Sequence, residues 1–381
     1  MKHLFCKIHL NKQDTTLSNP IKIANQFKPQ GKVIDVREFG HGNINGTYLV
    51  TLDSLEDKHF ILQRVNTNVF RQPQLVMQNM SIFSNHVRQR LQSDSNNINR
   101  RWEVPQVFLT KDNRDYLIDT DGSFWRAISF IEAGTTFDTI KNNQHAYEVG
   151  YALGMFHNLI NDLPTEKLAD TLPGFHVTPS YLQQYNLVVN QNPAPKSPEV
   201  EYCLQFVRDR QSWAHILENA LEQGHLCLRP IHGDPKVNNV MINTTTGQAI
   251  GVIDLDTVKP GLVHYDIGDC LRSGCNPLGE ETAEWQSVVF DTVVCKSILQ
   301  GYFSIAKDFL TEKDYEYIYD AIRLIAFELG LRFFTDYLAG NVYFKVKHPE
   351  HNLARALVQF KLTESIESQE TDIRAIIGEM E

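Results

Sequence analysis

Two short segments carry side chains that could transfer a phosphoryl group. The first runs Ile231-His232-Gly233-Asp234-Pro235-Lys236-Val237-Asn238-Asn239, and the second runs Val252-Ile253-Asp254-Leu255-Asp256. Asp234 could accept the proton of an attacking hydroxyl group, while Asn239 and Asp254 offer oxygen ligands that suit magnesium. Phosphoryl transfer depends mainly on positioning reactants and neutralising charge. This order of side chains therefore indicates a kinase-like catalytic loop followed by a metal-binding hairpin.

A simpler interpretation is that Asp234 and Asn239 only cap a turn, since both residue types often bond to local backbone amides. The catalytic interpretation is favoured because the second pair of carboxylates follows at the expected distance. We expect His232 to hold the loop by hydrogen bonding, and neither to catalyse nor to bind metal.

Length, composition and charge exclude several classes of protein. The chain has 381 residues, enough for two lobes with separate cores, and its 42% hydrophobic and 22% charged residues are ordinary for a globular protein. A formal net charge of -10 argues against nucleic-acid binding. No apolar run is long enough to cross a bilayer, and residues 1–10 lack a signal-peptide core. Six scattered cysteines without a CxxC pair predict free thiols in a reducing, cytoplasmic setting.

The pattern of apolar residues predicts an α+β fold with a small β-rich lobe and a larger helical lobe. We expect an N-terminal nucleotide-binding lobe at 1–130, a linker at 131–135, and a helical C-terminal lobe at 136–381 that holds the catalytic loop, metal site and substrate site. A ligand should bind between the lobes. Strands are expected at 33–36, 47–50, 60–62, 107–109, 115–118 and 125–130, and helices at 74–91, 146–159, 200–221, 290–309, 315–338 and 352–380.

The turn between the first two strands could approach the phosphates of a nucleotide. Gly40, Gly42 and Gly46 allow backbone amides to come close without a side-chain clash. An ordinary glycine hairpin is the alternative, and the downstream catalytic motif favours the nucleotide. In the third strand, Gln63 stands where a kinase normally has a lysine, and the helix at 74–91 contains no acidic residue.

Losing both partners of the usual Lys–Glu pair avoids stranding one buried charge. Magnesium, backbone amides, Gln63 or Arg64 would then hold the phosphates, although Arg64 could also be a solvated strand residue. We expect an adenine to stack near Phe130 and to bond to backbone groups of Glu132 or Ala133, because these residues lie at the linker.

Over residues 34–376 the chain resembles the aminoglycoside phosphotransferase superfamily, which has a protein-kinase-like fold. Within it, the chain is most similar to the bacterial N-acetylhexosamine 1-kinases. The segments that carry this likeness are GNINGTYLV at 42–50, FILQRVN at 60–66, IDLDT at 253–257, PG at 260–261, DIGD at 266–269, GLRFFTDYLAGNVYF at 330–344 and HPEHNL at 348–353. The glutamine of the third strand is similar to that group.

The resemblance implies an ATP- and Mg²⁺-dependent kinase that phosphorylates the anomeric hydroxyl of N-acetylglucosamine or N-acetylgalactosamine. It implies that Asp234 is the base and that Asn239 and Asp254 are metal ligands. Asp256 is a further candidate, which could bind the metal, steer the sugar hydroxyl or fix Asp254. Arg332, Tyr343 and Asn43 are implied near the sugar. The group often has histidine where Asn43 stands, and Gly233-Asp234-Pro235 is closer to the wider superfamily, so the preferred hexosamine stays open.

The residue types at 332–343 independently suit a neutral sugar, because they can donate and accept hydrogen bonds and supply a ring. Arg332 and Asp336 are four residues apart and should share a helix face. Two alternatives are an ion pair between these two residues and simple core packing of Tyr343. We expect Asp266 and Asp269 to bond to backbone amides of the catalytic loop, and His157 to be a core histidine.

Two other functions remain open. A kinase of another small alcohol would share the catalytic loop, but a choline site should show an aromatic cage with acidic residues and an aminoglycoside site should be strongly acidic. Homoserine is a further candidate acceptor. A non-catalytic nucleotide-binding module would explain the absent Lys–Glu pair, although Asp234, Asn239 and Asp254 argue against it. The sequence says nothing about oligomeric state.

Overall fold

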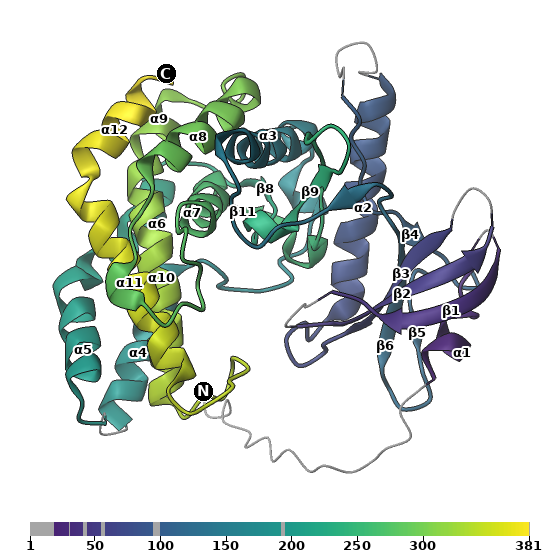
Figure 1. Cartoon of the computed structure of the whole chain (residues 1–381), viewed down its shortest axis with the longest axis horizontal. Helices are drawn as coiled ribbons and strands as arrows, with labels where there is room; N and C mark the ends of the chain where they lie inside the picture. The colour runs from purple at the N-terminus through teal and green to yellow at the C-terminus, as the bar shows by residue number, and fades with distance from the viewer. Residues whose placement is uncertain are drawn as a thin grey trace. The chain divides into compact units, whose positions relative to one another are not determined.

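The computed structural model describes residues 19–29, 31–40, 44–54, 58–93, 100–191 and 195–380. Its contacts divide the chain into two units (Figure 1). Residues 1–69 and 107–130 form the first, here called the sheet unit, and residues 70–106 and 131–381 form the second, here called the helical unit.

The sheet unit is built on an antiparallel sheet with strand order β1-β2-β3-β6-β4, in which β5 also pairs with β6. The strands are β1 (Lys32–Glu38), β2 (Gly46–Asp53), β3 (His59–Val65), β4 (Val107–Phe108), β5 (Leu117–Ile118) and β6 (Phe124–Ser129). All of the strands expected in this part of the chain are present. Their period-two alternation places every second side chain on one face.

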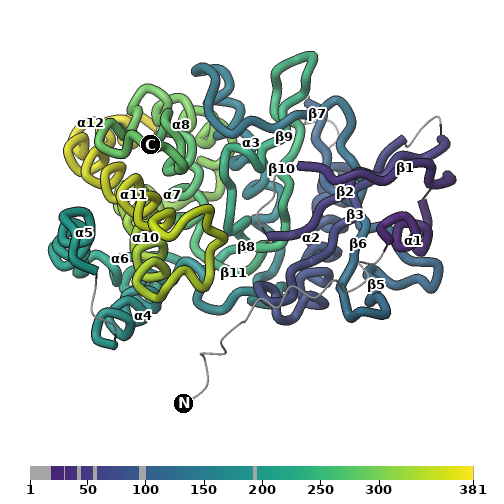
Figure 2. Tube along the Cα trace, turned by 60° about the horizontal axis from the view of Figure 1, so that its bottom comes forward, coloured from purple at the N-terminus to yellow at the C-terminus, as the bar shows by residue number. Residues whose placement is uncertain are grey.

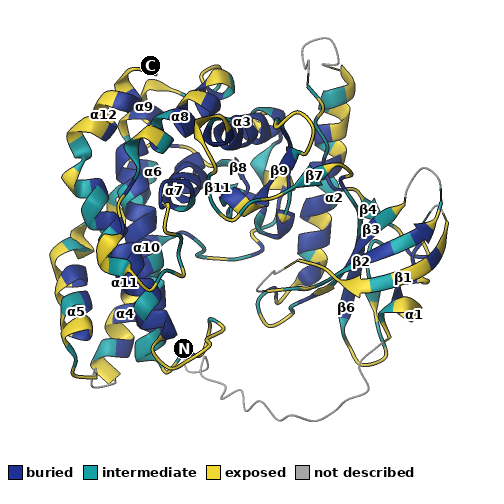
Figure 3. Cartoon of the chain, in the orientation of Figure 1, coloured by how far each residue is buried: buried dark blue, intermediate teal, exposed yellow. Residues whose placement is uncertain are grey.

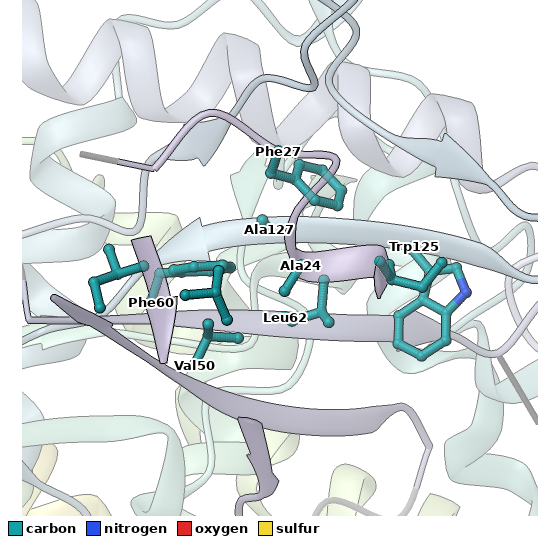
Figure 4. Packing of buried hydrophobic residues seen from close by; sticks show 10 residues of the cluster. Ala24, Phe27, Val50, Phe60, Leu62, Trp125 and Ala127 are labelled. Carbon is teal, nitrogen blue, oxygen red and sulfur yellow. The ribbon is translucent and has the colours of Figure 1, made fainter. Parts of the chain in front are cut away.

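Apolar side chains from that face form the core of the sheet unit. Phe60 and Leu62 of β3 pack with Trp125 and Ala127 of β6 (Figure 4). The short helix α1 (Pro20–Ala24) covers this cluster with Ala24, and the Asn19 side chain accepts a hydrogen bond from the Ile21 amide at the start of α1.

Helix α2 (Pro73–Ser93) belongs to the helical unit by its contacts, whereas the division expected from the sequence places it with residues 1–130. The Asn79 side chain donates hydrogen bonds to the carbonyls of Ala169 and Val258, at 2.8 and 2.9 Å. Phe83 stacks on Phe156 with ring centroids 5.1 Å apart. These contacts attach α2 to segments that lie up to 180 residues further along the chain.

The helical unit has a buried centre and an exposed shell. Helices α3 (Asn143–Ile160), α7 (Val263–Gly274) and α10 (Ile318–Leu338) are largely buried, whereas α5 (Pro198–Arg210) and α12 (Glu370–Gly378) expose much of their surface (Figure 3). Helix α10 runs beside α11 (His351–Ser368), as Figure 2 shows. The remaining helices are α4 (Thr178–Gln191), α6 (Ile216–Glu222), α8 (Thr292–Ala306) and α9 (Glu312–Glu316).

Three long helices expected from the sequence are interrupted. The segment 200–221 contains α5, a 3₁₀ turn at Gln211–His215 and α6. The segment 315–338 is reached through α9, whose start is fixed by a capping box between Thr311 and Asp314, and the chain turns at Tyr317 before α10. The segment 352–380 breaks at Gln369 between α11 and α12. Helices α4 and α7 were not expected, and both turn out to position the site.

Short strands complete the helical unit and frame the catalytic loop. They form two small sheets, with order β10-β9-β7 and β11-β8. Their bounds are β7 (Gly134–Thr135), β8 (Arg229–Ile231), β9 (Val240–Asn243), β10 (Ala249–Val252) and β11 (Lys259–Gly261). The α+β fold with a small sheet region and a larger helical part is confirmed.

Every cysteine within the described residues carries a free thiol, and no helix there combines the length and hydrophobicity that a membrane span requires.

Candidate functional site

The catalytic loop, residues 232–239, connects β8 to β9. β8 is fixed by its antiparallel pairing with β11, and β9 is fixed by its pairing with β10. At the end of the second hairpin, the Ile253 amide donates to the Asn239 carbonyl at 2.9 Å. This bond brings Asn239 beside Asp254, although the two residues are 15 positions apart in the sequence.

Asp266, in the first turn of α7, anchors the start of the loop. Its carboxylate is fully buried and accepts hydrogen bonds from the backbone amides of His232 (2.7 Å) and Gly233 (2.8 Å). His157 Nε2 lies 2.9 Å from the same carboxylate, which makes His157 the buried structural histidine that was expected. The expected role of Asp266 is confirmed. The same expectation for Asp269 is wrong, because Asp269 pairs with Arg272 of its own helix at 2.8 Å.

His232 holds the loop in the neutral state. Its Nε2 lies 2.9 Å from the Ile253 carbonyl, which can only accept, so Nε2 carries the hydrogen. Its Nδ1 then accepts from the Asp234 amide at 3.2 Å. Burial lowers the pKa of His232, in agreement with a neutral ring. The expected hydrogen-bonding role is therefore confirmed.

Gly233 must be glycine for two reasons. Its φ is +84°, and a Cβ atom at this position would lie 2.8 Å from the Thr257 carbonyl oxygen. The turn at Gly233 therefore lets the loop pass closely over the segment that follows Asp254.

The Asp234 carboxylate lies between a cation and an amide. Its Oδ2 is 3.1 Å from Lys236 Nζ and 3.4 Å from Asn239 Nδ2, and Asn239 also donates to the Asp234 carbonyl at 2.8 Å. The negative charge of Asp234 raises the pKa of Lys236 above its usual range. Sequence reasoning assigned no role to Lys236, although its place two residues after the candidate base is a usable signal.

The metal ligands expected from the sequence have suitable chemistry. Because Asn239 Nδ2 donates to Asp234, the side-chain oxygen Oδ1 is the end of this amide that could ligate a cation. Asp254 adopts a left-handed backbone, φ +63°, at the end of the hairpin. Asp256 is buried, and its carbonyl accepts from Thr171 Oγ1 at 3.4 Å.

No group of three His, Cys, Asp or Glu side chains able to hold a metal occurs within the described ranges. Magnesium is usually held by one or two carboxylates together with water and substrate phosphates, so a small set of protein ligands suits it. The assignment of Asn239, Asp254 and Asp256 to the metal stays a prediction.

An arginine surrounded by aromatic rings lies within electrostatic reach of Asp234. The Arg332 guanidinium is 4.9 Å from the Tyr181 ring centroid, 5.2 Å from that of Phe175 and 5.6 Å from that of Phe344. Burial opposes its charge, but Tyr181, Glu328, Tyr343 and Asp234 together raise the pKa of Arg332. We call Phe175, Tyr181, Arg332, Tyr343 and Phe344 the acceptor-side cluster.

Asp336 does not pair with Arg332, although both lie on α10. Its carboxylate accepts hydrogen bonds from the backbone amides of Val342, Tyr343 and Phe344, at 2.8 to 3.0 Å. The ion-pair alternative is therefore wrong. Core packing of Tyr343 is also wrong, since this residue is 59% exposed. Asp336 instead shapes the loop that presents Tyr343.

Sequence reasoning missed Phe175, His176 and Tyr181, which lie just before and within α4. Their segment carries no motif, and their importance depends on packing of α4 against α10, about 150 residues away. No local signal in the sequence identifies them.

In the sheet unit, both ends of the Gln63 side-chain amide form hydrogen bonds with neighbouring strands. Its Oε1 accepts from Arg126 Nε (2.9 Å) and Nη2 (2.7 Å), and its Nε2 donates to Thr47 Oγ1 (3.2 Å). Arg126 is only 1% exposed, whereas Arg64 is exposed on the opposite side of the strand from Gln63. Arg126 is thus the buried cation of this sheet, and sequence reasoning did not identify it.

The remaining candidates of the sheet unit are Gly40, Gly42 and Phe130 for the nucleotide and Asn43 for the sugar. Gly40 has φ +75° at the end of β1, while Gly42 and Asn43 lie outside the described residues. Phe130 packs edge-on against Phe39 and His59, with centroids 5.9 and 5.6 Å apart.

Glu132 and Ala133 already use their carbonyl groups. The Glu132 carbonyl accepts from Arg101 at 2.7 Å, and the Ala133 carbonyl accepts from the Thr244 amide at 2.9 Å. An adenine contact in this segment would therefore use backbone N–H groups more readily than carbonyl oxygens.

Comparison with known proteins agrees with this arrangement. The model of the phosphotransferase enzyme family matches residues 35–286, more than half of the chain, and the chain therefore belongs to this family.

Solved phosphotransferases share the fold across most of the chain. An aminoglycoside phosphotransferase from Alicyclobacillus acidocaldarius matches with a TM-score of 0.64 and 14% identity, covering 97% of this chain and all 100% of that one. A microcompartment-associated aminopropanol kinase matches with a TM-score of 0.59 and 15% identity, covering 93% and 98% of the two chains. Choline kinase from Cryptosporidium parvum matches with a TM-score of 0.54 and 15% identity, covering 90% of this chain and 91% of that one. The expected aminoglycoside phosphotransferase-type fold is confirmed.

Proposed function

We propose that this protein is an ATP- and Mg²⁺-dependent kinase that phosphorylates the anomeric hydroxyl of N-acetylhexosamines. The observation that carries the kinase assignment is the position of Asp234, held by the buried loop anchor and flanked by Lys236 and Asn239. The acceptor assignment combines the resemblance of residues 330–344 to the N-acetylhexosamine 1-kinases with the chemistry of the acceptor-side cluster.

Asp234 acts on the acceptor hydroxyl. As the C1 oxygen attacks the γ-phosphorus of ATP, the bond between this oxygen and phosphorus forms and the bond from phosphorus to the β,γ-bridging oxygen breaks. The hydroxyl proton passes to the Asp234 carboxylate, and ADP leaves. Lys236, 3.1 Å from that carboxylate, adds positive charge where the phosphoryl group moves.

Asn239, Asp254 and Asp256 would hold the magnesium ion, which neutralises phosphate charge during transfer. Gln63 and Arg64 remain candidates for the phosphates, together with amides of the turn at Gly40 and Gly42. Phe130 and the backbone of Glu132 and Ala133 remain candidates for the adenine.

The acceptor-side cluster favours a neutral acceptor over a cationic one. A quaternary ammonium or aminoglycoside amine would meet the positive charge of Arg332, which already lies over three rings that a cation would otherwise use. A neutral sugar suits this surface, because Arg332 can donate to its oxygens while an aromatic ring covers its apolar face. Tyr343 and Asn43 are the further sugar contacts that the resemblance suggests.

A panel of acceptors tests the proposal. ADP release with Mg²⁺-ATP would be measured for N-acetylglucosamine, N-acetylgalactosamine, glucose, galactose, choline, aminopropanol, homoserine and kanamycin. We expect turnover with the N-acetylated sugars and little with the charged acceptors. Asp234→Asn serves as the matched inactive variant and should lose turnover while it still binds nucleotide.

Preference for choline, aminopropanol, homoserine or kanamycin would keep the kinase assignment and remove the sugar assignment. Nucleotide binding without turnover of any acceptor would favour the non-catalytic module. Unchanged turnover in Asp234→Asn would contradict the base role.

A further inference from the structure

A buried histidine lies between the catalytic loop and the acceptor-side cluster. His176 is 4% exposed, and its backbone adopts the left-handed region with φ +66°. A non-glycine residue reaches this region only when its surroundings hold it there. Neither the motif nor the resemblance assigns this residue a role.

Hydrogen-bond geometry determines how many protons the ring carries. Nε2 lies 2.8 Å from the Gly233 carbonyl, which only accepts, so Nε2 must carry a hydrogen. Nδ1 lies 3.0 Å from Glu328 Oε1. A neutral imidazole has a single N–H, so the second contact requires a proton either on Nδ1 or on Glu328.

The surroundings of Glu328 place this proton on the histidine. Glu328 Oε2 accepts a hydrogen bond from Thr178 Oγ1 at 2.8 Å, and Oε1 lies 3.9 Å from Arg332 Nη1. Besides His176, the Glu328 carboxylate therefore faces one hydrogen-bond donor and one cation, and the proton that it shares with the ring lies on the ring. His176 is therefore an imidazolium with a hydrogen bond at each nitrogen.

The electrostatic surroundings agree with this protonation. The ionisable groups of the described residues that face the ring are Glu328 on α10, and Asp269 and Tyr265 on α7; the Tyr265 ring stacks 5.5 Å away. Burial by itself would lower the pKa of His176, but Glu328, Asp269 and the Gly233 carbonyl outweigh it and raise this pKa.

One partner of His176 lies next to Asp234, and the other lies next to Arg332. Gly233 directly precedes Asp234, and Glu328 lies one helical turn before Arg332 on α10. We infer that His176 is a positioning residue that, as an imidazolium, joins the loop carrying the base to the glutamate that orients the acceptor-binding arginine. This inference rests on the proposed function in assigning the base role to Asp234 and the acceptor to Arg332.

The consequence is a fixed placement of the acceptor hydroxyl relative to Asp234. Small displacements of reacting groups cost large factors in rate, so loss of this link should affect acceptor use more than nucleotide use. A histidine that served only the core would instead change stability, with the acceptor KM unchanged.

Kinetics of His176→Gln test the link. The glutamine side chain is neutral and cannot donate from two separated atoms. We expect the KM for the acceptor that the wild-type enzyme phosphorylates, N-acetylglucosamine first, to rise at least about tenfold, with the KM for ATP little changed. Glu328→Gln should give the same pattern, and the double variant should cost less than the two single changes multiplied together.

His264→Gln is the matched control, since His264 is equally buried in α7 and its Nε2 bonds to the Asp314 carbonyl, away from the loop. It should lower stability without changing the acceptor KM. An unchanged acceptor KM in His176→Gln, together with lowered stability, would overturn the inference.

An NMR measurement on the ligand-free protein separates this inference from the proposed function. Long-range ¹H–¹⁵N spectra should show one imidazole protonated at both nitrogens at a pH of about 8, well above the ordinary histidine pKa. This signal should disappear in His176→Gln and remain in His264→Gln. A singly protonated His176 would refute the charged link, whatever acceptor the enzyme uses.

Discussion

The catalytic loop and the acceptor-side cluster use polar side chains in contrasting ways. His232 and Asn239 of the loop, together with Asp266 of α7, bond mainly to backbone groups of the loop, so the chain path around Asp234 is fixed. In the cluster, Arg332 is held by the faces of Tyr181 and Phe175, with its carboxylate Glu328 at 3.9 Å. The hydrogen bonds of the loop thus fix its own conformation, whereas Arg332 is held by ring faces and one distant carboxylate. We propose that its N–H groups donate to the acceptor.

Two buried histidines on either side of the same peptide show the same contrast. His232 has one acceptor and one donor as partners and is neutral, while His176 has two acceptors and is charged. Both rings are buried. Partners, and not burial, therefore decide which histidine carries charge.

The largest effect is expected at the base. Asp234→Asn should reduce kcat by about 10²–10⁴-fold, because the amide cannot accept the hydroxyl proton. Nucleotide affinity should change little, as measured by calorimetric titration of Mg²⁺-ADP. A kcat within twofold of wild type would mean that the loop positions substrates without a base.

The next largest effect is expected at the loop anchor. Asp266→Asn replaces an acceptor of three hydrogen bonds with a side chain whose amide faces backbone donors. We expect the free energy of unfolding to fall by about 3 kcal/mol and kcat to fall with it. Urea unfolding followed by circular dichroism measures the first quantity.

Asp269→Asn is the matched control on the same helix, since its partner is Arg272 and not the loop. Stability should fall here too, because this pair is buried, but kcat per folded molecule should fall less than in Asp266→Asn, because Asp269 acts on His176 and Lys236 only through its charge. Equal losses of kcat in the two variants would remove the special role of Asp266.

A smaller effect is expected in the acceptor-side cluster. Arg332→Lys keeps the charge but loses the planar group that lies over the rings, so the acceptor KM should rise about tenfold with kcat for saturating acceptor less affected. Steady-state kinetics with the accepted hexosamine measures both constants.

Arg323→Lys is the control for that change, because Arg323 lies on the same helix and over the Trp213 ring at 4.4 Å. Its substitution should leave the acceptor KM unchanged. A similar rise in both variants would indicate a general disturbance of α10.

The smallest effect expected is a pH dependence of stability. Since the pKa of His176 is raised in the fold, its contribution is fully present below the unfolded pKa of about 6.5 and is lost as pH rises through its folded pKa. The pKa of His232 is lowered in the fold, so its effect on the pH dependence of stability has the opposite sign. Keeping this ring neutral lowers the stability as pH falls below the unfolded pKa of about 6.5. Unfolding of His176→Gln and wild type across this range should converge at high pH, and parallel curves would contradict the assignment.

The sequence predicted the parts of the site that depend on local spacing. The catalytic loop, the hairpin that follows it and the anchoring role of Asp266 all lie within a short stretch whose turns and strands fix their geometry. Strands of the sheet unit were predicted for a related reason, because alternation of apolar residues reports one buried face.

The remaining contacts of the site depend on packing between elements far apart in the sequence. The periodicity of apolar residues does not predict such packing. Tyr181 acquires its contact with Arg332 through docking of α4 on α10, and Arg126 meets Gln63 through the pairing of β3 with β6. Asp269 was misassigned because, like Asp266, it lies just after the predicted metal-binding hairpin, whereas Arg272 one turn later pairs with its carboxylate. Breaks in the predicted long helices fall at single positions, such as Tyr317 between α9 and α10 and Gln369 between α11 and α12, within runs that look continuously helical.

The position of the transferred phosphate distinguishes an anomeric kinase from a kinase of any other hydroxyl group. The product formed from Mg²⁺-ATP and N-acetylglucosamine or N-acetylgalactosamine would be examined by ³¹P NMR with proton coupling, and by mild acid hydrolysis. If the enzyme phosphorylates the anomeric hydroxyl, the phosphate will couple to the anomeric proton and will be released by mild acid. An acid-stable phosphate on another hydroxyl, or product only from amino alcohols, would contradict it.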